Sequence, residues 1–453
     1  MDIAERIETA TLRPKKVDME IGSGKEGNAM TGRVYYSLYD RLLHEKALLE
    51  AFKGVKASQG SSGIDRESLE EFESDLGENV RKLVKELREK SYTPRPVKRV
   101  EIPKGNGKVR ELGIPSVRDR VVQQALLTIL QPIYEEDFHP SSYGYRPGRS
   151  CHQAIEKATR FIRKYERKHA VDMDLSKCFD TLDHELIIQF MRKRVTDGSI
   201  LALVEKFLKS GVMIGERFEE VEKGSPQGGV ISPLLANIYL NEFDQFMKGR
   251  NYRIVRYADD ILILCESRRS AEHAQAVATK FLEETLKLKV NTEKTHITHC
   301  SEGVKFLGVE IFCNYTKVQD GKVEAFKKEV KRLTKKNQGM NLKMVIARIN
   351  PLLRGFANYF RIANCTGMFR SFMQWIRRRL RAIQLKLWKK PEKLHRRLRQ
   401  AGYTGTFMKI KMTSWRNSAC WQAHSAMSTK WFDDLGLFNL GTVATGLVVP
   451  IEK

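Results

Sequence analysis

The sequence predicts an α+β fold with an antiparallel sheet, followed by a helical and strongly basic C-terminal part. Two apolar, β-rich runs flank a doubly acidic turn at Asp259-Asp260, which is typical of a β-hairpin. The order from Met173 to Ile311 is strand, helices, hairpin, helix and strand, as in an α+β domain. From Ala325 onward, apolar and basic residues recur at helical spacing.

Composition indicates a folded protein that binds a polyanion. The chain has 453 residues, enough for two to four domains, and 41% of them are apolar. The formal net charge is +25, and residues 325–400 hold 22 Lys or Arg against two acids. Such a field points to a phosphate backbone or an anionic membrane. Aromatic residues spread through the same stretch favour nucleic acid.

The cysteines and the N-terminus predict an intracellular protein. The seven cysteines are scattered and include no C-x-x-C pair, so we expect reduced thiols. Residues 1–16 are charged and lack the apolar core of a signal peptide, and no run approaches the length of a membrane span. A cytoplasmic location without a membrane partner is therefore expected.

The N-terminal third is expected to be a tail followed by helices around one hairpin. Residues 1–31 show little periodicity, whereas apolar spacing predicts helices at 34–55, 69–90, 118–134 and 153–168. Two alternating runs around Gly105-Asn-Gly107 predict a hairpin over 97–114. Lys104 and Arg110 beside its tip would suit a triphosphate clamp, and a solvated basic turn is the alternative.

The middle of the chain predicts a strand that ends in a carboxylate and a glycine-rich loop. Asp172 and Asp174 alternate with apolar residues, and a helix is expected near Asp183. Taken alone, Asp174 fits a metal ligand or an ordinary surface residue, and Phe179 fits a core aromatic. The glycine-rich loop at 223–229 precedes a helix with Ser232 as expected N-cap and Pro233 in its first turn. Beyond it, a helix at 269–286 and one glycine-kinked strand at 304–311 are predicted.

The acidic turn is predicted to bind a cation. Adjacent aspartates repel each other, so a fold that fixes Asp259 and Asp260 at one hairpin tip is expected to place a cation there. Mg²⁺ is the expected cation, because it prefers carboxylate oxygens. A solvated turn is the alternative for the dipeptide alone, since Asp is a common turn residue.

Several motifs resemble, in their order, those of reverse transcriptases. They are Asp174 with Phe179, Ser225-Pro-Gln-Gly-Gly229, Tyr257-Ala-Asp-Asp260, Lys294 and Phe306-Leu-Gly308. Leu352-Leu-Arg-Gly-Phe-Ala-Asn-Tyr-Phe360 resembles the thumb, or maturase, region of bacterial group II intron-encoded reverse transcriptases. The resemblance covers roughly residues 34–453, and no counterpart of the HNH endonuclease of some relatives is expected after Trp431.

The resemblance implies a right-hand polymerase and the order of its domains along the chain. Residues 1–33 would be an N-terminal extension, 34–170 the fingers, 171–324 the palm, 325–390 a helical basic thumb and 391–453 a C-terminal DNA-binding region. Two Mg²⁺ ions, for which Mn²⁺ can substitute, would be held by Asp174, the Leu175 carbonyl, Asp259 and Asp260. The resemblance assigns nucleotide contacts to Lys104, Arg110, Phe179 and Gln227, with Phe179 as the steric gate against a ribose 2′-hydroxyl.

The remaining implied roles concern proton transfer and nucleic acid. Lys294 would donate a proton to pyrophosphate. The primer grip is assigned to Phe306, Leu307 and Gly308. A surface for the nucleic-acid backbone is assigned to Arg354, Arg361, Arg377, Arg378 and Arg381.

The implied function is an RNA-dependent DNA polymerase that also serves its group II intron as a maturase. Its partners would be an RNA template, a DNA or RNA primer, deoxynucleoside triphosphates, the intron RNA and target DNA. One alternative is an RNA-binding splicing cofactor with an idle polymerase site, although the intact carboxylates argue against it. A reverse transcriptase of a defence or DNA-repair system is the other, and Ala258 and the long C-terminal region favour the intron.

Overall fold

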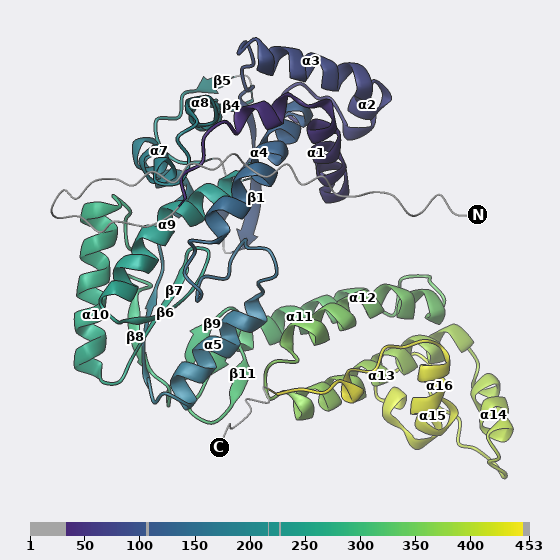
Figure 1. The fold of residues 1–453 in the computed structure, drawn as a ribbon. Coiled ribbons are helices and arrows are strands. Elements are labelled where there is room, and N and C mark those ends of the chain that lie inside the picture. Colours follow the sequence, from purple (N-terminus) through teal and green to yellow (C-terminus); the bar gives the residue numbers. More distant parts are fainter. Residues whose placement is uncertain (1–32, 106–107, 216, 226–227, 447–453) are drawn as a thin grey trace, which may run out of the picture. The chain divides into compact units, whose positions relative to one another are not determined.

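The computed structural model describes residues 33–105, 108–215, 217–225 and 228–446, which divide into two compact units (Figure 1). Unit 1 comprises the described residues of Met1–Ser150, Met173–Ile263 and Arg269–His296. Unit 2 comprises Cys151–Asp172, Leu264–Arg268 and the described residues of Ile297–Lys453. Helices accompany three small sheets, which confirms the predicted α+β class. In the described part of the chain, no helix is long and apolar enough to cross a membrane.

Unit 1 begins with helices that bury one apolar stripe each. They are η1 (Tyr39–Leu43), α1 (Glu45–Ser58), α2 (Leu69–Ser74), α3 (Leu76–Arg88) and α4 (Val117–Glu135). Ser68 and Glu71 form a capping box at the start of α2. The single helix predicted over 69–90 is two helices, because the backbone at Asp75 leaves the helical region.

A second group of helices follows Met173 in the sequence. These are α6 (Cys178–Thr181), α7 (His184–Arg192), α8 (Gly198–Leu208), α9 (Ser232–Gly249), α10 (Arg268–Lys280) and the π-helical turn η2 (Phe281–Thr285). The Asp183 side chain caps α7, as predicted for a helix starting there. The Ser232 prediction is wrong by one position, because Ile231 is the N-cap of α9 and Ser232 already belongs to the helix.

The basic hairpin predicted over 97–114 is confirmed. Strand β1 (Val97–Gly105) pairs antiparallel with β2 (Lys108–Ile114). Strand β1 also pairs in parallel with β4 (Val212–Ile214), and β4 pairs with β5 (Arg217–Glu219). The resulting sheet has the order β2-β1-β4-β5.

The acidic hairpin is also confirmed. It consists of β6 (Arg253–Tyr257) and β7 (Asp260–Cys265), in a sheet of order β6-β7-β3-β8 with β3 (His169–Met173) and β8 (His296–His299). Every β7 residue after Asp260 is buried, as expected for a strand covered on both faces. Ala258 occupies the turn with a φ of 57°, a left-handed conformation that a non-glycine residue rarely adopts.

The hairpin of β9 (Val304–Phe306) and β10 (Val309–Ile311) in unit 2 corrects the strand predicted over 304–311. The chain reverses at Leu307 and Gly308, whose φ angles of 45° and 81° are both positive. A two-residue turn of this kind joins antiparallel strands, and β10 pairs with both β9 and β11 (Thr316–Val318). Cys300 and Cys313, on either side of this hairpin, form a disulfide, so the prediction of reduced thiols is wrong for these two.

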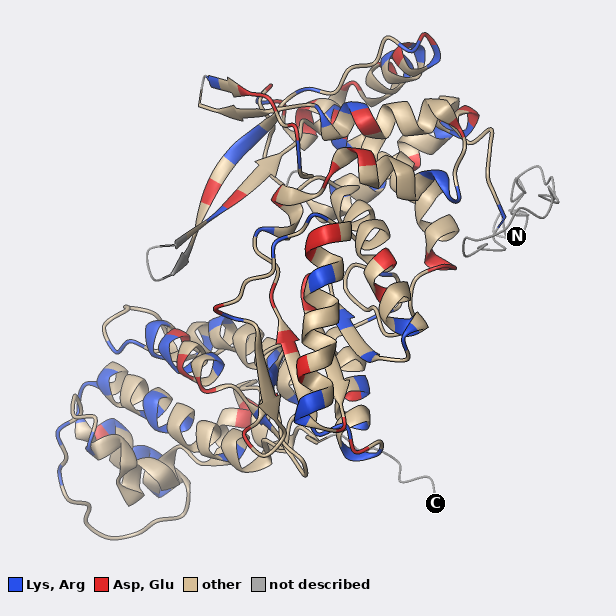
Figure 2. Cartoon of the chain, turned by 90° about the vertical axis from the view of Figure 1, so that its left-hand side faces the viewer, with Lys and Arg blue, Asp and Glu red and all other residues tan. Residues whose placement is uncertain are grey.

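The rest of unit 2 is helical and basic, as predicted. It contains α5 (Cys151–Arg163), α11 (Asp320–Leu333), α12 (Leu342–Phe360), α13 (Thr366–Trp388), α14 (Pro391–Gln400), η3 (Asn417–Ala419), α15 (Trp421–Ala426), α16 (Thr429–Asp434) and η4 (Leu440–Thr442). Phe326 stacks on Phe356 in the interior, with ring centroids 4.0 Å apart. Lys and Arg residues recur along the length of these helices (Figure 2).

A buried ion pair ties α9 to the acidic hairpin. The Arg256 Nη2 lies 2.6 Å from Asp244 Oδ2, and both side chains have 0% exposure. The Nε also donates to Asp244 at 2.9 Å. The Nη1 donates to Asn237 Oδ1 at 3.1 Å and to the Ala258 carbonyl at 3.0 Å. One guanidinium thus connects a helix to the turn that carries the acids.

We expect Arg256→Ala to lower the free energy of unfolding of unit 1 by about 3–5 kcal/mol, because it leaves the Asp244 carboxylate buried without its partner. Denaturant unfolding followed by circular dichroism measures this change. Lys53→Ala removes a solvent-exposed pair with Glu50 and is the control, with an expected change below about 1 kcal/mol. Similar losses in the two variants would contradict the structural role of Arg256.

Candidate active site

Three carboxylates gather beside Lys294 in unit 1. Asp174 directly follows β3, while Asp259 and Asp260 lie at the β6–β7 turn. The Lys294 Nζ donates to Asp174 Oδ2 at 2.8 Å. This hydrogen bond is the main reason that the pKa of Lys294 is raised, and the charges of Asp260 and Asp259 add to the effect against the opposing effect of burial. The structure therefore brings together the four predicted catalytic residues.

The loop that carries Lys294 is aligned with the Asp174 segment by an antiparallel bridge between Leu175 and Val290. The Asn291 amide donates to the Asp174 carbonyl at 2.8 Å, and its side-chain Nδ2 donates to Asp174 Oδ2 at 3.1 Å. The bridge thus uses the carbonyl of Asp174 rather than that of Leu175. Asn291 is a site residue that the sequence analysis did not identify.

The acidic turn rests on the loop at 143–148. The Tyr143 amide donates to the Arg256 carbonyl at 2.9 Å, and Asn237 Nδ2 donates to the Gly144 carbonyl at 2.8 Å. A Cβ on Gly144 would lie 2.3 Å from the Ala258 amide nitrogen. Only glycine allows the two backbones to come this close.

Tyr145 is a further site residue that the sequence analysis missed. Its ring meets the Phe179 ring edge-on, with centroids 6.2 Å apart and an interplanar angle of 83°. Burial raises the pKa of the Tyr145 phenol, the negative charges of Asp259 and Asp260 raise it further, and Arg110 opposes the shift. The aromatic and glycine-rich sequence around Tyr145 was the available signal, but nothing in it indicated proximity to the acids.

The glycine-rich loop is attached to the segment that carries Phe179. The Ser225 amide donates to the Phe179 carbonyl at 2.7 Å. A Cβ on Gly224 would lie 2.7 Å from the Asp180 carbonyl, and one on Gly228 would lie 2.4 Å from a β2 carbonyl. Both glycines have positive φ angles, 89° and 117°. Gly224 is therefore fitted closely against α6, and Gly228 against the basic hairpin.

The other nucleotide contacts predicted from sequence are only partly described. Arg110 is exposed on β2, and its charge acts on Tyr145. The Lys104 side chain and the whole of Gln227 lie outside the described residues. Phe179 is 7% exposed, so its ring is as buried as that of a core aromatic, which is what the sequence predicts for this residue taken alone.

The residues predicted for the primer grip form the β9–β10 turn of unit 2. Phe306 is buried at the end of β9. The Leu307 carbonyl accepts a hydrogen bond from the Tyr359 hydroxyl at 2.9 Å. The Gly308 carbonyl accepts one from the Gln319 amide at 3.1 Å. This turn is thereby attached to α12 and to the start of α11.

The five arginines predicted to contact nucleic acid differ in exposure. Arg354, Arg361 and Arg378 are exposed, and Arg377 is half-buried. Arg381 is 3% exposed, and its Nε donates to the Met427 carbonyl at 3.1 Å. Burial lowers the pKa of Arg381 to about 10. The structure therefore places the Arg381 guanidinium of α13 inside unit 2, against the segment between α15 and α16, and not at the surface to which the prediction assigned it.

The donor set suits a hard divalent cation that substrate helps to bind. In the described ranges, no three His, Cys, Asp or Glu side chains enclose a metal position by themselves. Mg²⁺ is usually held by one or two carboxylates, with water and substrate phosphates in the other positions. Asp174 and Asp259 with Asp260 offer such oxygen ligands, and the cationic Lys294 beside them shows that the cluster attracts positive charge.

Comparison with known families gives two adjacent matches. A family model described as reverse transcriptase (RNA-dependent DNA polymerase) matches residues 102–311. A model described as the group II intron maturase-specific domain matches residues 323–402. The first match includes all of the clustered carboxylates, and the second includes most of α11 and the whole of α12, α13 and α14.

Two of the three curated relatives described here are named as intron proteins. Protein YkfC of Escherichia coli is 36% identical over 300 residues, covering 58% of this chain and 79% of YkfC. The group II intron-encoded protein LtrA of Lactococcus lactis is 30% identical over 345 residues, covering 61% of this chain and 57% of LtrA. A putative COX1/OXI3 intron 2 protein of Saccharomyces cerevisiae is 28% identical over 326 residues, covering 59% of this chain and 38% of that protein. The chain thus spans most of YkfC and little more than half of LtrA.

We expect Gly144→Ala to displace the acidic turn, because the new Cβ would lie 2.3 Å from the Ala258 nitrogen. Faster hydrogen exchange at the amides of 256–260, measured by mass spectrometry, is the expected result, with a loss of stability of about 1–3 kcal/mol. Gly198→Ala is the control, since a Cβ there meets nothing within 4 Å. Unchanged exchange in Gly144→Ala would show that the turn is not supported by this contact.

Proposed function

The chain belongs to the family of group II intron-encoded reverse transcriptases, and we propose that it extends a primer on an RNA template by two-metal nucleotidyl transfer. We propose as a second role that it assists the splicing and mobility of its intron as a maturase. The observation that carries the polymerase proposal is the meeting of Asp174, Asp259 and Asp260 beside Lys294. An idle site has no physical need to hold three mutually repelling carboxylates together.

In the proposed mechanism, Asp174, Asp259, Asp260 and the Leu175 carbonyl would hold two Mg²⁺ ions, for which Mn²⁺ can substitute. When bound, these ions would activate the primer 3′-hydroxyl and neutralise the charge of the triphosphate. The chain itself supplies oxygen ligands from elements fixed by the β6-β7-β3-β8 sheet. Lys294 keeps its proton next to Asp174, which supports its proposed role as a proton donor to pyrophosphate.

Nucleotide selection is proposed to depend on Phe179. Its ring is held from one side by Tyr145, and its backbone carbonyl is held by Ser225 at the start of the glycine-rich loop. A ring fixed in this way would have little freedom to make room for a 2′-hydroxyl. Arg110 and Lys104 are proposed to bind the triphosphate, and Gln227 to lie under the new base pair.

We propose that unit 2 binds RNA through the backbone. Its described helices place Arg354, Arg361 and Arg378 at the surface, while phenylalanines fill the interior. Template, primer, deoxynucleoside triphosphates, intron RNA and target DNA remain proposed partners, in a cytoplasmic ribonucleoprotein. The proposed domains are fingers at 34–170, palm at 171–324, thumb at 325–390 and a DNA-binding region at 391–453.

Asp259→Ala should abolish primer extension on an RNA template with Mg²⁺ and deoxynucleotides, because it removes a proposed metal ligand. RNA affinity, measured by filter binding, should stay within about twofold of wild type, because the phosphate contacts that dominate affinity remain. Asp40→Ala, at an exposed carboxylate of η1, is the control and should extend normally. No extension by a folded, RNA-binding wild-type chain would instead favour a splicing cofactor with an idle site.

Phe179→Ala should increase the use of ribonucleotides relative to deoxynucleotides, because it removes the proposed gate ring. We expect the ratio of kcat/KM values to shift by roughly tenfold or more, the discrimination that a steric contact of about 1–3 kcal/mol provides. Phe190→Ala removes a ring of similar exposure, 8%, that packs on Tyr239, and controls for general destabilisation. The same ratio in wild type and Phe179→Ala would exclude the gate role.

A further inference from the structure

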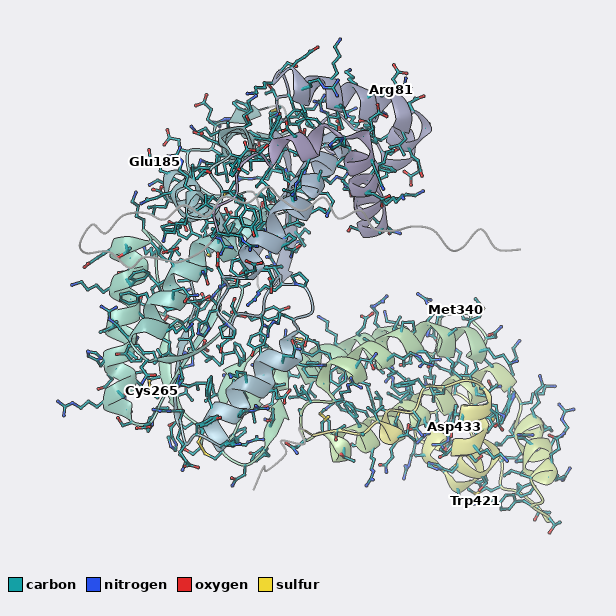
Figure 3. All side chains as sticks on the ribbon, viewed as in Figure 1. Arg81, Glu185, Cys265, Met340, Trp421 and Asp433 are labelled. Atoms are coloured by element: carbon teal, nitrogen blue, oxygen red, sulfur yellow. A yellow bond between two sulfur atoms is a disulfide. The ribbon has the colours of Figure 1, made fainter. Side chains whose placement is uncertain are left out.

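A group of apolar side chains, three of them exposed, lies in the C-terminal part of unit 2. It consists of the exposed Tyr403, Met408 and Trp421 and the half-buried Phe407, and we call it the aromatic patch. Trp421 is 53% exposed, Tyr403 is 42% exposed and Met408 is 74% exposed. The Trp421 ring centroid lies 5.8 Å from that of Tyr403 and 6.3 Å from that of Phe407. Figure 3 shows the labelled Trp421 at the periphery of this unit.

The rings of the aromatic patch do not cover one another. Trp421 makes interplanar angles of 50° with Tyr403 and 55° with Phe407, so the rings meet at a tilt. Inside unit 2, by contrast, Phe326 and Phe356 are buried and stack at 28° with centroids 4.0 Å apart. The fold therefore buries aromatic rings where its own core requires them and leaves the Trp421 ring open to a planar group from outside.

The stretch of the chain that contains the aromatic patch is strongly basic. Residues 389–428 contain a single acid, Glu392, and nine basic residues: Lys389, Lys390, Lys393, Arg396, Arg397, Arg399, Lys409, Lys411 and Arg416. Arg396 and Arg399 on α14, and Lys409 and Lys411 in the following loop, are exposed. Among the described residues from 389 to 446, no ion pair neutralises any of these cations. The fitting partner is thus anionic and also presents flat apolar faces.

We propose that the aromatic patch binds unpaired bases of single-stranded nucleic acid, with the neighbouring Lys and Arg residues on its phosphates. Aromatic side chains in a basic setting bind single strands in this way with little sequence preference. A duplex keeps its base faces stacked inside, so it can use the cations but not the rings. Neither stacking on a base nor a contact with a phosphate involves the ribose 2′-hydroxyl. The aromatic patch is therefore expected to bind DNA and RNA single strands alike. The proposal rests on the proposed DNA-binding role of residues 391–453, which it deepens by naming single strands as the ligand, and it needs no nucleotide addition.

The test uses the full chain and fluorescence anisotropy without nucleotide triphosphates. The probes are oligothymidylate and oligouridylate of about twelve nucleotides, within the range of known single-strand sites, and a blunt DNA duplex of the same length. Trp421→Ala should weaken binding of both single strands by roughly tenfold, and Trp421→Phe should restore most of the affinity. Duplex affinity should change by less than about twofold, because the phosphate contacts remain.

Two controls and a second patch variant separate this site from other effects. Tyr165→Ala removes a tyrosine of unit 2 that is 51% exposed and outside the patch, and it should bind all probes as wild type does. Asp259→Ala should also bind normally, so a failure of the polymerase proposal would not be mistaken for a failure here. If Trp421→Ala does not fold, as judged by circular dichroism, Tyr403→Ala replaces it with the same expected direction of change. Unchanged single-strand affinity in the folded patch variant, equal losses for strand and duplex, or a loss for RNA alone would each overturn the proposal.

Discussion

The position of the acidic turn depends on the buried pair of Arg256 and Asp244. Burying two charges is costly, and an apolar pair of the same volume often gives equal stability. The guanidinium does something that an apolar side chain cannot do, because it also donates to Asn237 and to the Ala258 carbonyl. It thereby fixes α9, the hairpin turn and the left-handed Ala258 in one arrangement. Asn237 in turn donates to the Gly144 carbonyl, which places the loop before Tyr145.

This rigid support is needed because the three carboxylates repel one another. Lys294 and Asn291 offset part of the charge at Asp174 through hydrogen bonds of 2.8 Å and 3.1 Å. The rest of the arrangement is imposed by backbone contacts, such as the close approach of Gly144 to Ala258. A site that is preorganised in this way can bind cations without first ordering its ligands, which is the usual basis of electrostatic catalysis.

The two units differ in how their charged residues are distributed. Unit 1 concentrates negative charge at one turn and compensates it locally, whereas unit 2 spreads positive charge over helices with an aromatic interior. The position of each arginine in unit 2 decides its use. Arg378 is exposed, but Arg381, three residues further along α13, is buried and holds the Met427 carbonyl. Net charge therefore indicates a polyanionic partner without identifying the residues that touch it.

The sequence by itself determined the α+β class, both long hairpins, the basic helices and the family. The elements follow from local patterns, which are the apolar runs of β6 and β7, the turn residues between β1 and β2, and the apolar spacing in α12 and α13, whereas the family follows from the order of the motifs. Tertiary structure decided what local patterns do not contain. Cys300 pairs with Cys313, and Tyr145 contacts Phe179, so each contact joins residues that are separated along the chain. Arg381 is buried because other segments of unit 2 cover it. The spacing of residues in one segment carries no information on which other segment will cover it, so these contacts required the folded chain.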